Sequence, residues 1–134
     1  MKETTYTPNA PAPVGPYSQA VKVNGFVYTA GQLGIDPETG ELAGSDIGSQ
    51  TAQALANVRE ILAAAGCGID DIVKVTLYVT HLRLFHEVNA VYGAFFADEG
   101  VTSPPARAIA EVSALPLGAQ IEIDAIAAVP NQTQ

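Results

Sequence analysis

The sequence predicts a single α+β domain in which two helices cover one face of a mixed β-sheet. Its 134 residues are enough for one ordinary domain and too few for two. Hydrophobic residues make up 48% of the chain, so a packed core is expected. Helical and extended patterns alternate in the order ββαβαββ, without a linker or a low-complexity segment, and two helices suffice for only one face of such a sheet. Residues 1–134 are therefore expected to form one domain.

The N-terminal part of the chain is predicted to be an extended arm followed by a β-hairpin. Residues 8–16 hold four prolines and a glycine, which excludes a helix or a central strand. Residues 17–23 and 26–30 are predicted as strands. The dipeptide Asn24-Gly25 joins them, and this dipeptide is typical of a tight hairpin turn.

A turn at residues 36–40 leads into the first predicted helix. Apolar residues recur at helical spacing on one face of residues 47–65. Either Ser45 or Asp46 can cap the start of this helix, and Gly66 can end it.

The C-terminal half is predicted as strand, helix and two further strands. Residues 72–79 are rich in β-branched side chains, which favours a strand. Thr80 is expected to cap a second helix that ends near Gly100, and residues 107–113 and 120–128 follow as strands. The inward face of the second helix is predicted to consist of Phe85, Val88, Tyr92 and Phe95 or Phe96.

The sheet face without helices is expected to be amphipathic. Alternation in the last strand places Ile121 and Ile123 on one face, and Glu122 and Asp124 among apolar residues on the other. In the third predicted strand, the same alternation groups Val73 with three later apolar residues. Isolated charges between apolar side chains suit a face that is buried in an oligomer. Only 15% of the residues are charged, which also favours burial of surface against another subunit.

Charge argues against two classes of partner. The net charge is −8, and the six Lys and Arg residues are dispersed singly along the chain. Nucleic-acid binding needs clustered cations, so neither nucleic acid nor an anionic membrane is an expected partner. The N-terminus lacks the apolar region of an export signal and no stretch reaches membrane-spanning length, so the cytoplasm is the expected location.

Few residues are candidates for chemistry. The chain has no Walker loop, GxGxxG, HExxH or GxSxG motif. His81 and His86 are five residues apart, so they share no helix face and are interpreted as surface residues rather than metal ligands. Cys67 is the only cysteine, which excludes an intramolecular disulfide, and its place after a helix end indicates a structural role. No metal site is expected.

The remaining candidates are charges within strands. Arg107 is always ionised, so burying it requires an anion. That anion is either a ligand or a protein carboxylate, with Glu111 and Glu122 as the candidates. Glu122 itself is an acid/base group, a partner of the arginine, or a residue at the rim of a site. Tyr17 is either a site residue or a hydrophobic plug.

The chain resembles the RidA/YjgF/UK114 family from about residue 9 to residue 129. Six stretches carry the resemblance, in the right order and at the right spacing. They are residues 12–20 (Ala-Pro-Val-Gly-Pro-Tyr-Ser-Gln-Ala), Gly31-Gln32, residues 53–58, residues 88–96, Pro105-Ala106-Arg107, and Leu115-Pro116 together with residues 121–127.

The resemblance implies a fold, an assembly and an activity. The fold is chorismate-mutase-like, and three subunits form a homotrimer whose sheets make an inner barrel, with a cleft between each pair of subunits. The activity is hydrolysis of reactive 2-imino or 2-enamino acids, such as 2-iminobutanoate and 2-iminopropanoate, to 2-keto acids and ammonia. Pyridoxal-phosphate-dependent dehydratases release these substrates, and the hydrolysis itself needs no cofactor.

The resemblance also implies roles for individual residues. Arg107 matches the arginine that binds the substrate carboxylate, and Glu122 matches the glutamate that holds or activates water. Tyr17, Gly31 and Asn89 match residues that line the cleft.

The chain departs from some family members at two positions. Ala30 lacks a hydroxyl that often contacts the ligand, and Ile109 stands where a cysteine can occur, with its backbone carbonyl as the expected contact. A non-catalytic sensor of 2-keto acids is the alternative function. A ribonuclease activity has also been attached to this family, and the charge of this chain disfavours it.

Overall fold

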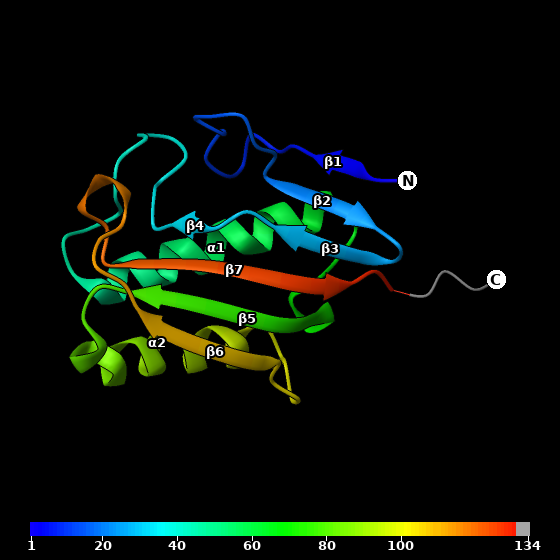
Figure 1. Ribbon diagram of the computed structural model, residues 1–134. Coiled ribbons are helices and arrows are strands. Elements are labelled where there is room, and N and C mark those ends of the chain that lie inside the picture. Colours follow the sequence, from blue (N-terminus) through cyan, green and yellow to red (C-terminus); the bar gives the residue numbers. More distant parts are fainter. Residues whose placement is uncertain (131–134) are drawn as a thin grey trace.

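The computed structural model describes residues 1–130 and shows two helices packed on one face of a mixed sheet (Figure 1). The helices are α1 (Ile47–Ala64) and α2 (Phe85–Asp98). The strand order is β1-β2-β3-β7-β5-β6, with β4 also paired to β7. The strands are β1 (Glu3–Thr5), β2 (Ala20–Val23), β3 (Phe26–Thr29), β4 (Gln32–Leu33), β5 (Ile72–Val79), β6 (Ala106–Glu111) and β7 (Ile121–Ala128). The predicted fold class is confirmed.

Helix α1 begins and ends as its terminal residues predict. Of the two candidate caps, Asp46 is the one used: its carboxylate accepts a hydrogen bond from the Ser49 N–H at 2.8 Å. This bond also holds the pKa of Asp46 below its ordinary value. Beyond the other end, Gly66 takes a positive φ of 89°, and the Cys67 N–H donates to the Leu62 carbonyl at 2.8 Å.

Two short strands were not expected from the sequence. β1 pairs with β2 along three residues, and β4 pairs with β7 along two. Neither is long enough to show an alternating pattern. Each is a strand only because it pairs with a longer strand beside it. The first strand of the hairpin also starts later than predicted, at Ala20 instead of Tyr17, because residues 17–19 belong to the arm.

The prediction that Thr80 caps the second helix is wrong. A turn of 3₁₀ helix, η2 (Leu82–Leu84), lies between β5 and α2, and α2 begins at Phe85 without a side-chain cap. The Thr80 hydroxyl lies 3.1 Å from Nδ1 of His81 instead. The first N–H of this turn, from Leu82, is satisfied from a distance because it donates to the Glu111 carboxylate at 2.8 Å.

Strand β7 lies at the centre of the sheet and organises the core. It pairs antiparallel with β3, β4 and β5, while β5 pairs parallel with β6. Its odd-numbered residues are fully buried beneath the helices, and its even-numbered residues are half-buried on the uncovered face, as the alternation predicts. In β5 the prediction for Val73 is wrong: a bulge between Ile72 and Lys74 breaks the alternation and leaves Val73 43% exposed.

Cys67 lies in the core, as its interpretation as a structural residue predicts. It is 4% exposed, and burial raises the pKa of its thiol, as does the nearby Asp71 carboxylate. No helix among residues 1–130 is both long and apolar enough to cross a membrane.

Helix α1 also holds the irregular segment that follows β4. The buried side chain of Asn57 donates to the carbonyls of Leu33 and Ile35 at 3.1 and 2.9 Å. The buried Gln50 side chain donates to the Gly44 carbonyl and accepts from the Gln120 N–H. These amides therefore supply the hydrogen bonds that the segment does not obtain from a sheet.

The segment approaches α1 so closely that only glycine fits at position 34. A Cβ atom there would lie 2.6 Å from Cα and 2.9 Å from the carbonyl carbon of Gln50, and this backbone cannot move aside. We expect Gly34→Ala to lower the free energy of unfolding by about 1–3 kcal/mol, the usual range for overpacking. Urea unfolding at equal protein concentration measures this change.

Gly93→Ala is the matched control for this substitution. Gly93 lies exposed in the middle of α2, and a Cβ atom there would have no neighbour within 4 Å. Alanine at this position should raise the free energy of unfolding by about 0.8–1 kcal/mol through helix propensity. Equal stability of Gly34→Ala and the wild-type protein would contradict the proposed close approach.

Candidate functional site

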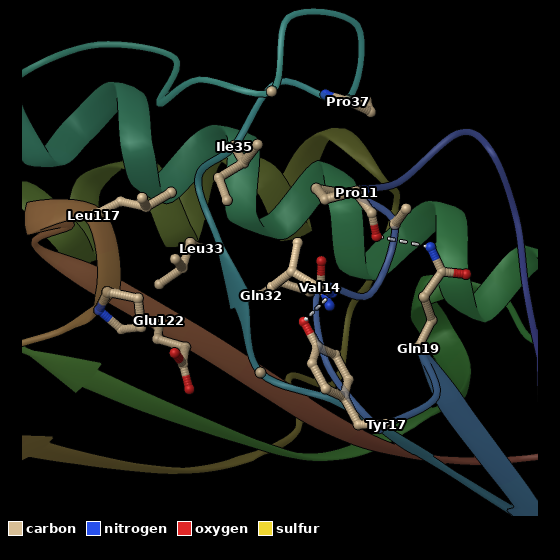
Figure 2. Close-up of a pocket in the computed structure, with 14 residues that line it drawn as sticks. Pro11, Val14, Tyr17, Gln19, Gln32, Leu33, Ile35, Pro37, Leu117 and Glu122 are labelled. Carbon is tan, nitrogen blue, oxygen red and sulfur yellow. Dashed lines mark hydrogen bonds between the residues drawn. The ribbon is translucent and has the colours of Figure 1, made fainter.

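A cleft of about 670 Å³ opens beside β4 and brings three of the predicted site residues together (Figure 2). Tyr17 comes from the arm, Gly31 from the link between β3 and β4, and Glu122 from β7. The remaining walls are largely apolar. They consist of Pro11, Ala12, Val14, Gln19, Gln32, Leu33, Ile35, Pro37, Gly40, Pro116 and Leu117.

The arm forms one wall of the cleft because a buried side chain holds it. The Gln19 side chain accepts from the Thr7 N–H at 2.7 Å and donates to the carbonyls of Thr7 and Pro11 at 3.0 and 2.9 Å. The arm then turns so that Tyr17 is 50% exposed, and its hydroxyl accepts a weak hydrogen bond from the Val14 N–H at 3.4 Å. Tyr17 is therefore a wall of the cleft and not a buried plug.

Gly31 lies directly against the carboxyl group of Glu122. A Cβ atom at Gly31 would lie 2.7 Å from Cδ of Glu122 and would collide with the carboxylate oxygen. The absence of a side chain at position 31 thus allows the carboxyl group to reach the cleft beside exposed backbone.

Glu122 is the only carboxylic acid among the described residues that line the cleft, and its environment favours the protonated form. Burial raises the pKa of Glu122 above its ordinary value of 4.5, and the neighbouring Asp124 carboxylate raises it further. A carboxyl group with a raised pKa exchanges protons closer to neutral pH, which suits general acid–base chemistry.

The other predicted residues lie elsewhere in the chain. Arg107 and Ile109 are on the edge strand β6, and Asn89 is on α2; none of the three lines the cleft. Arg107 is in register with Val75 of β5, whose side chain is buried under the helices, whereas Glu122 is on the opposite face of the sheet. Within a single chain, the candidate cation Arg107 and the candidate acid Glu122 therefore lie on opposite faces of the sheet.

The alternative interpretation of Arg107 as a salt-bridge residue is not supported. Within residues 1–130, the only ion pairs involve Arg59, which contacts Glu60 and Glu99. Glu111 accepts from the Leu82 N–H instead, and Arg107 donates to Oδ1 of Asn89 at 2.8 Å.

His81 and His86 are exposed, as the interpretation as surface residues predicts. The described part of the chain holds no cluster of three or more potential metal-ligating side chains.

Leu117 is a wall residue that sequence reasoning missed, because it lies between the last two predicted strands and no pattern there indicates a site. It is 66% exposed, and its φ of 61° is unusual for a residue other than glycine. Residues held in sparsely populated backbone regions cluster at active sites and ligand clamps, which makes Leu117 a candidate binding residue. The proline before it and the glycine after it are the signal that could have marked this turn.

Comparison with known proteins gives a consistent result. A family model described as Endoribonuclease L-PSP matches residues 7–129. A RutC family protein of Pyrococcus horikoshii is 49% identical over 127 residues, which are 95% of this chain and 98% of the relative. A 2-iminobutanoate/2-iminopropanoate deaminase of Salmonella typhimurium is 47% identical over the same shares of the two chains.

Two solved Escherichia coli structures show the same fold. The YjgF gene product is 44% identical with a TM-score of 0.91, covering 96% of this chain and 99% of the relative. TdcF with bound serine is 38% identical with a TM-score of 0.90, covering 94% of this chain and 98% of the relative.

The pH dependence of stability tests the environment of Glu122. Because its pKa is raised on folding, this residue favours the fold most below its unfolded pKa, and that contribution is lost as the pH rises through the folded value. We expect Glu122→Gln to match the wild-type protein in free energy of unfolding at pH 4 and to exceed it at pH 7. Urea unfolding at both pH values measures the difference. A Glu122→Gln variant that is less stable than the wild-type protein at pH 7 would contradict a raised pKa of Glu122.

Proposed function

The chain belongs to the endoribonuclease L-PSP family, which includes the RidA and YjgF proteins, and we propose that it hydrolyses reactive 2-imino acids to 2-keto acids and ammonia. The observation that carries the proposal is the Glu122 carboxyl group, which has a raised pKa and lies against Gly31 in an apolar cleft. The Salmonella typhimurium relative named as a deaminase of this kind covers almost the whole chain.

The proposed chemistry moves both protons of one water molecule to the imine nitrogen. Water adds to C2 while Glu122 accepts one of its protons and returns it to the nitrogen, which gives a carbinolamine with a C2–OH and a C2–NH2 group. Glu122 then accepts the hydroxyl proton and passes it to the amino nitrogen, so the C2–N bond breaks, ammonia leaves and the C2–O bond becomes a carbonyl. Imines hydrolyse in water unaided, so positioning the substrate beside one water molecule provides much of the acceleration.

Arg107 is the proposed carboxylate-binding group. It is exposed, it is bound by neutral partners, and its guanidinium has two parallel N–H donors that match a carboxylate. TdcF, which shares the fold, binds serine, a ligand with a carboxylate on the carbon that carries nitrogen. Asn89 and the backbone at Ile109 complete this part of the proposed site.

A complete site then requires a second copy of the chain. Arg107 lies on an edge strand, and Glu122 lies on the opposite face of the sheet in a cleft that Arg107 does not line. We propose a homotrimer in which β6 of one subunit faces the cleft of the next. The uncovered sheet face supports this assembly because it exposes Phe26 and Tyr28 to 39% and 42%.

We do not extend the ribonuclease in the family's description to this chain. Its net charge is −8, and Arg59, one of its six cations, is already paired with carboxylates. A surface of this kind lacks the cluster of cations that neutralises phosphates.

Substitution of the two charged residues tests the mechanism. The assay adds purified protein to a threonine dehydratase reaction and follows the decay of the imine, which the wild-type protein should accelerate. Arg107→Ala should abolish both acceleration and 2-keto acid binding, and Arg107→Lys should restore little because a point charge cannot replace the guanidinium fork. Glu122→Gln should retain binding and lose at most about 10²-fold in kcat/KM, the low end for acid–base catalysis. Saturable keto-acid binding by a wild-type protein that leaves imine decay unchanged would support the sensor function instead.

The mass in solution tests the assembly. Light scattering at micromolar concentration should give three times the chain mass of 13.9 kDa. A monomer that still hydrolyses imines would contradict the shared site, because the two charged groups would then have to act from opposite faces of one sheet.

A further inference from the structure

Three side chains of α2 contact the guanidinium of Arg107. Its central carbon lies 5.5 Å from the ring centre of Phe85 and 4.9 Å from that of Tyr92, and Nη1 donates to Oδ1 of Asn89 at 2.8 Å. Arg107 projects from the neighbouring β6 strand, which runs beside α2 in Figure 1.

The positions of the three residues follow from helix geometry. Residues 85, 89 and 92 have the i, i+4, i+7 spacing of a single helix face, and they span about 10 Å along the axis. The two rings therefore flank the amide along one stripe, and Arg107 lies over that stripe. We call Phe85, Asn89 and Tyr92 the α2 stripe.

The α2 stripe is distinguished by consisting of neutral side chains only. Arg59 provides an internal comparison: it lies 5.7 Å from the ring centre of Phe95, and it is also paired with the carboxylates of Glu60 and Glu99. Arg107 has aromatic contacts of the same kind, and within residues 1–130 it has no carboxylate partner. Aromatic faces and an amide oxygen orient a guanidinium without neutralising it.

We propose that the α2 stripe is a positioning device that fixes the Arg107 guanidinium while leaving its full charge for an incoming carboxylate. The inference rests on the proposed function and assigns to Phe85 and Tyr92 a role beyond core packing. A free arginine side chain loses rotamer entropy when it binds a ligand. Holding the guanidinium in advance removes part of that loss from the binding step.

The ring of Tyr92, and not its hydroxyl, does the positioning. Tyr92 is 8% exposed, and its hydroxyl has no hydrogen-bond partner among the described residues. Burial raises the pKa of this hydroxyl, whereas the nearby Arg107 lowers it. Phenylalanine keeps the ring and removes only the unpaired group, so Tyr92→Phe should retain ligand binding.

The decisive experiment measures 2-oxobutanoate affinity by calorimetry, together with kcat and KM for imine hydrolysis. Phe85→Leu should weaken binding and raise KM by about threefold to tenfold with little change in kcat, because it removes one of the two cation–π contacts that hold the guanidinium. Asn89→Asp should weaken binding by more than tenfold and leave the melting temperature unchanged or higher, because a carboxylate then neutralises Arg107.

Phe95→Leu is the matched control because it removes the α2 ring under Arg59, which lies outside the proposed site. It should change stability and leave affinity and KM unchanged. Wild-type affinity in both Phe85→Leu and Asn89→Asp would overturn the inference. So would an equal loss of affinity in Phe95→Leu, since the effect would then be one of general stability.

A second measurement separates this inference from the proposed function. Ring currents from Phe85 and Tyr92 should shift the Arg107 Nε–Hε resonance from its free value in the ligand-free protein, and Phe85→Leu should move it back. If the wild-type protein neither binds 2-oxobutanoate nor speeds imine decay, the proposed function fails, and this resonance still decides whether the guanidinium is fixed. An unshifted resonance in the wild-type protein would refute the positioning role.

Discussion

Buried carboxamide side chains hold the parts of this protein that have no regular structure. Gln19 satisfies the backbone of the proline-rich arm, and Gln50 and Asn57 satisfy the segment that follows β4. A buried polar group without its partner costs about 1–3 kcal/mol, so replacing any of these amides would release a stretch of chain as well as a single contact. The arm and this segment are two walls of the cleft. The shape of the cleft therefore depends on the hydrogen bonds that these buried amides make to the backbone of its walls.

The sheet keeps the two candidate charges of the site apart. Glu122 lies on the face without helices, Arg107 lies on the helix side of the edge strand, and β5 runs between their strands. Within one subunit, the two side chains therefore do not neutralise each other. In the proposed trimer they would come together only across the boundary between two subunits.

Much of this fold could be predicted from the sequence, because its long elements have clear periodicity. The inward residues of α1 and the alternation of β7 are as predicted. Short elements such as β4 and the bulge at Val73 depend on pairing with distant strands, which a local pattern does not contain. In the candidate site, the family resemblance points to Arg107, but the contact of Phe85 with it could not be predicted, because the helical spacing of Phe85 is also that of a core residue.

The burial of Cys67 has a consequence for the redox behaviour of the protein. This thiol is the only one in the chain, it is 4% exposed, and its raised pKa keeps the reactive thiolate scarce. Neither the described residues that line the cleft nor the α2 stripe contains sulfur. Peroxide would thus find no thiol in the cleft or the α2 stripe, and the proposed hydrolysis should not depend on a reduced cysteine.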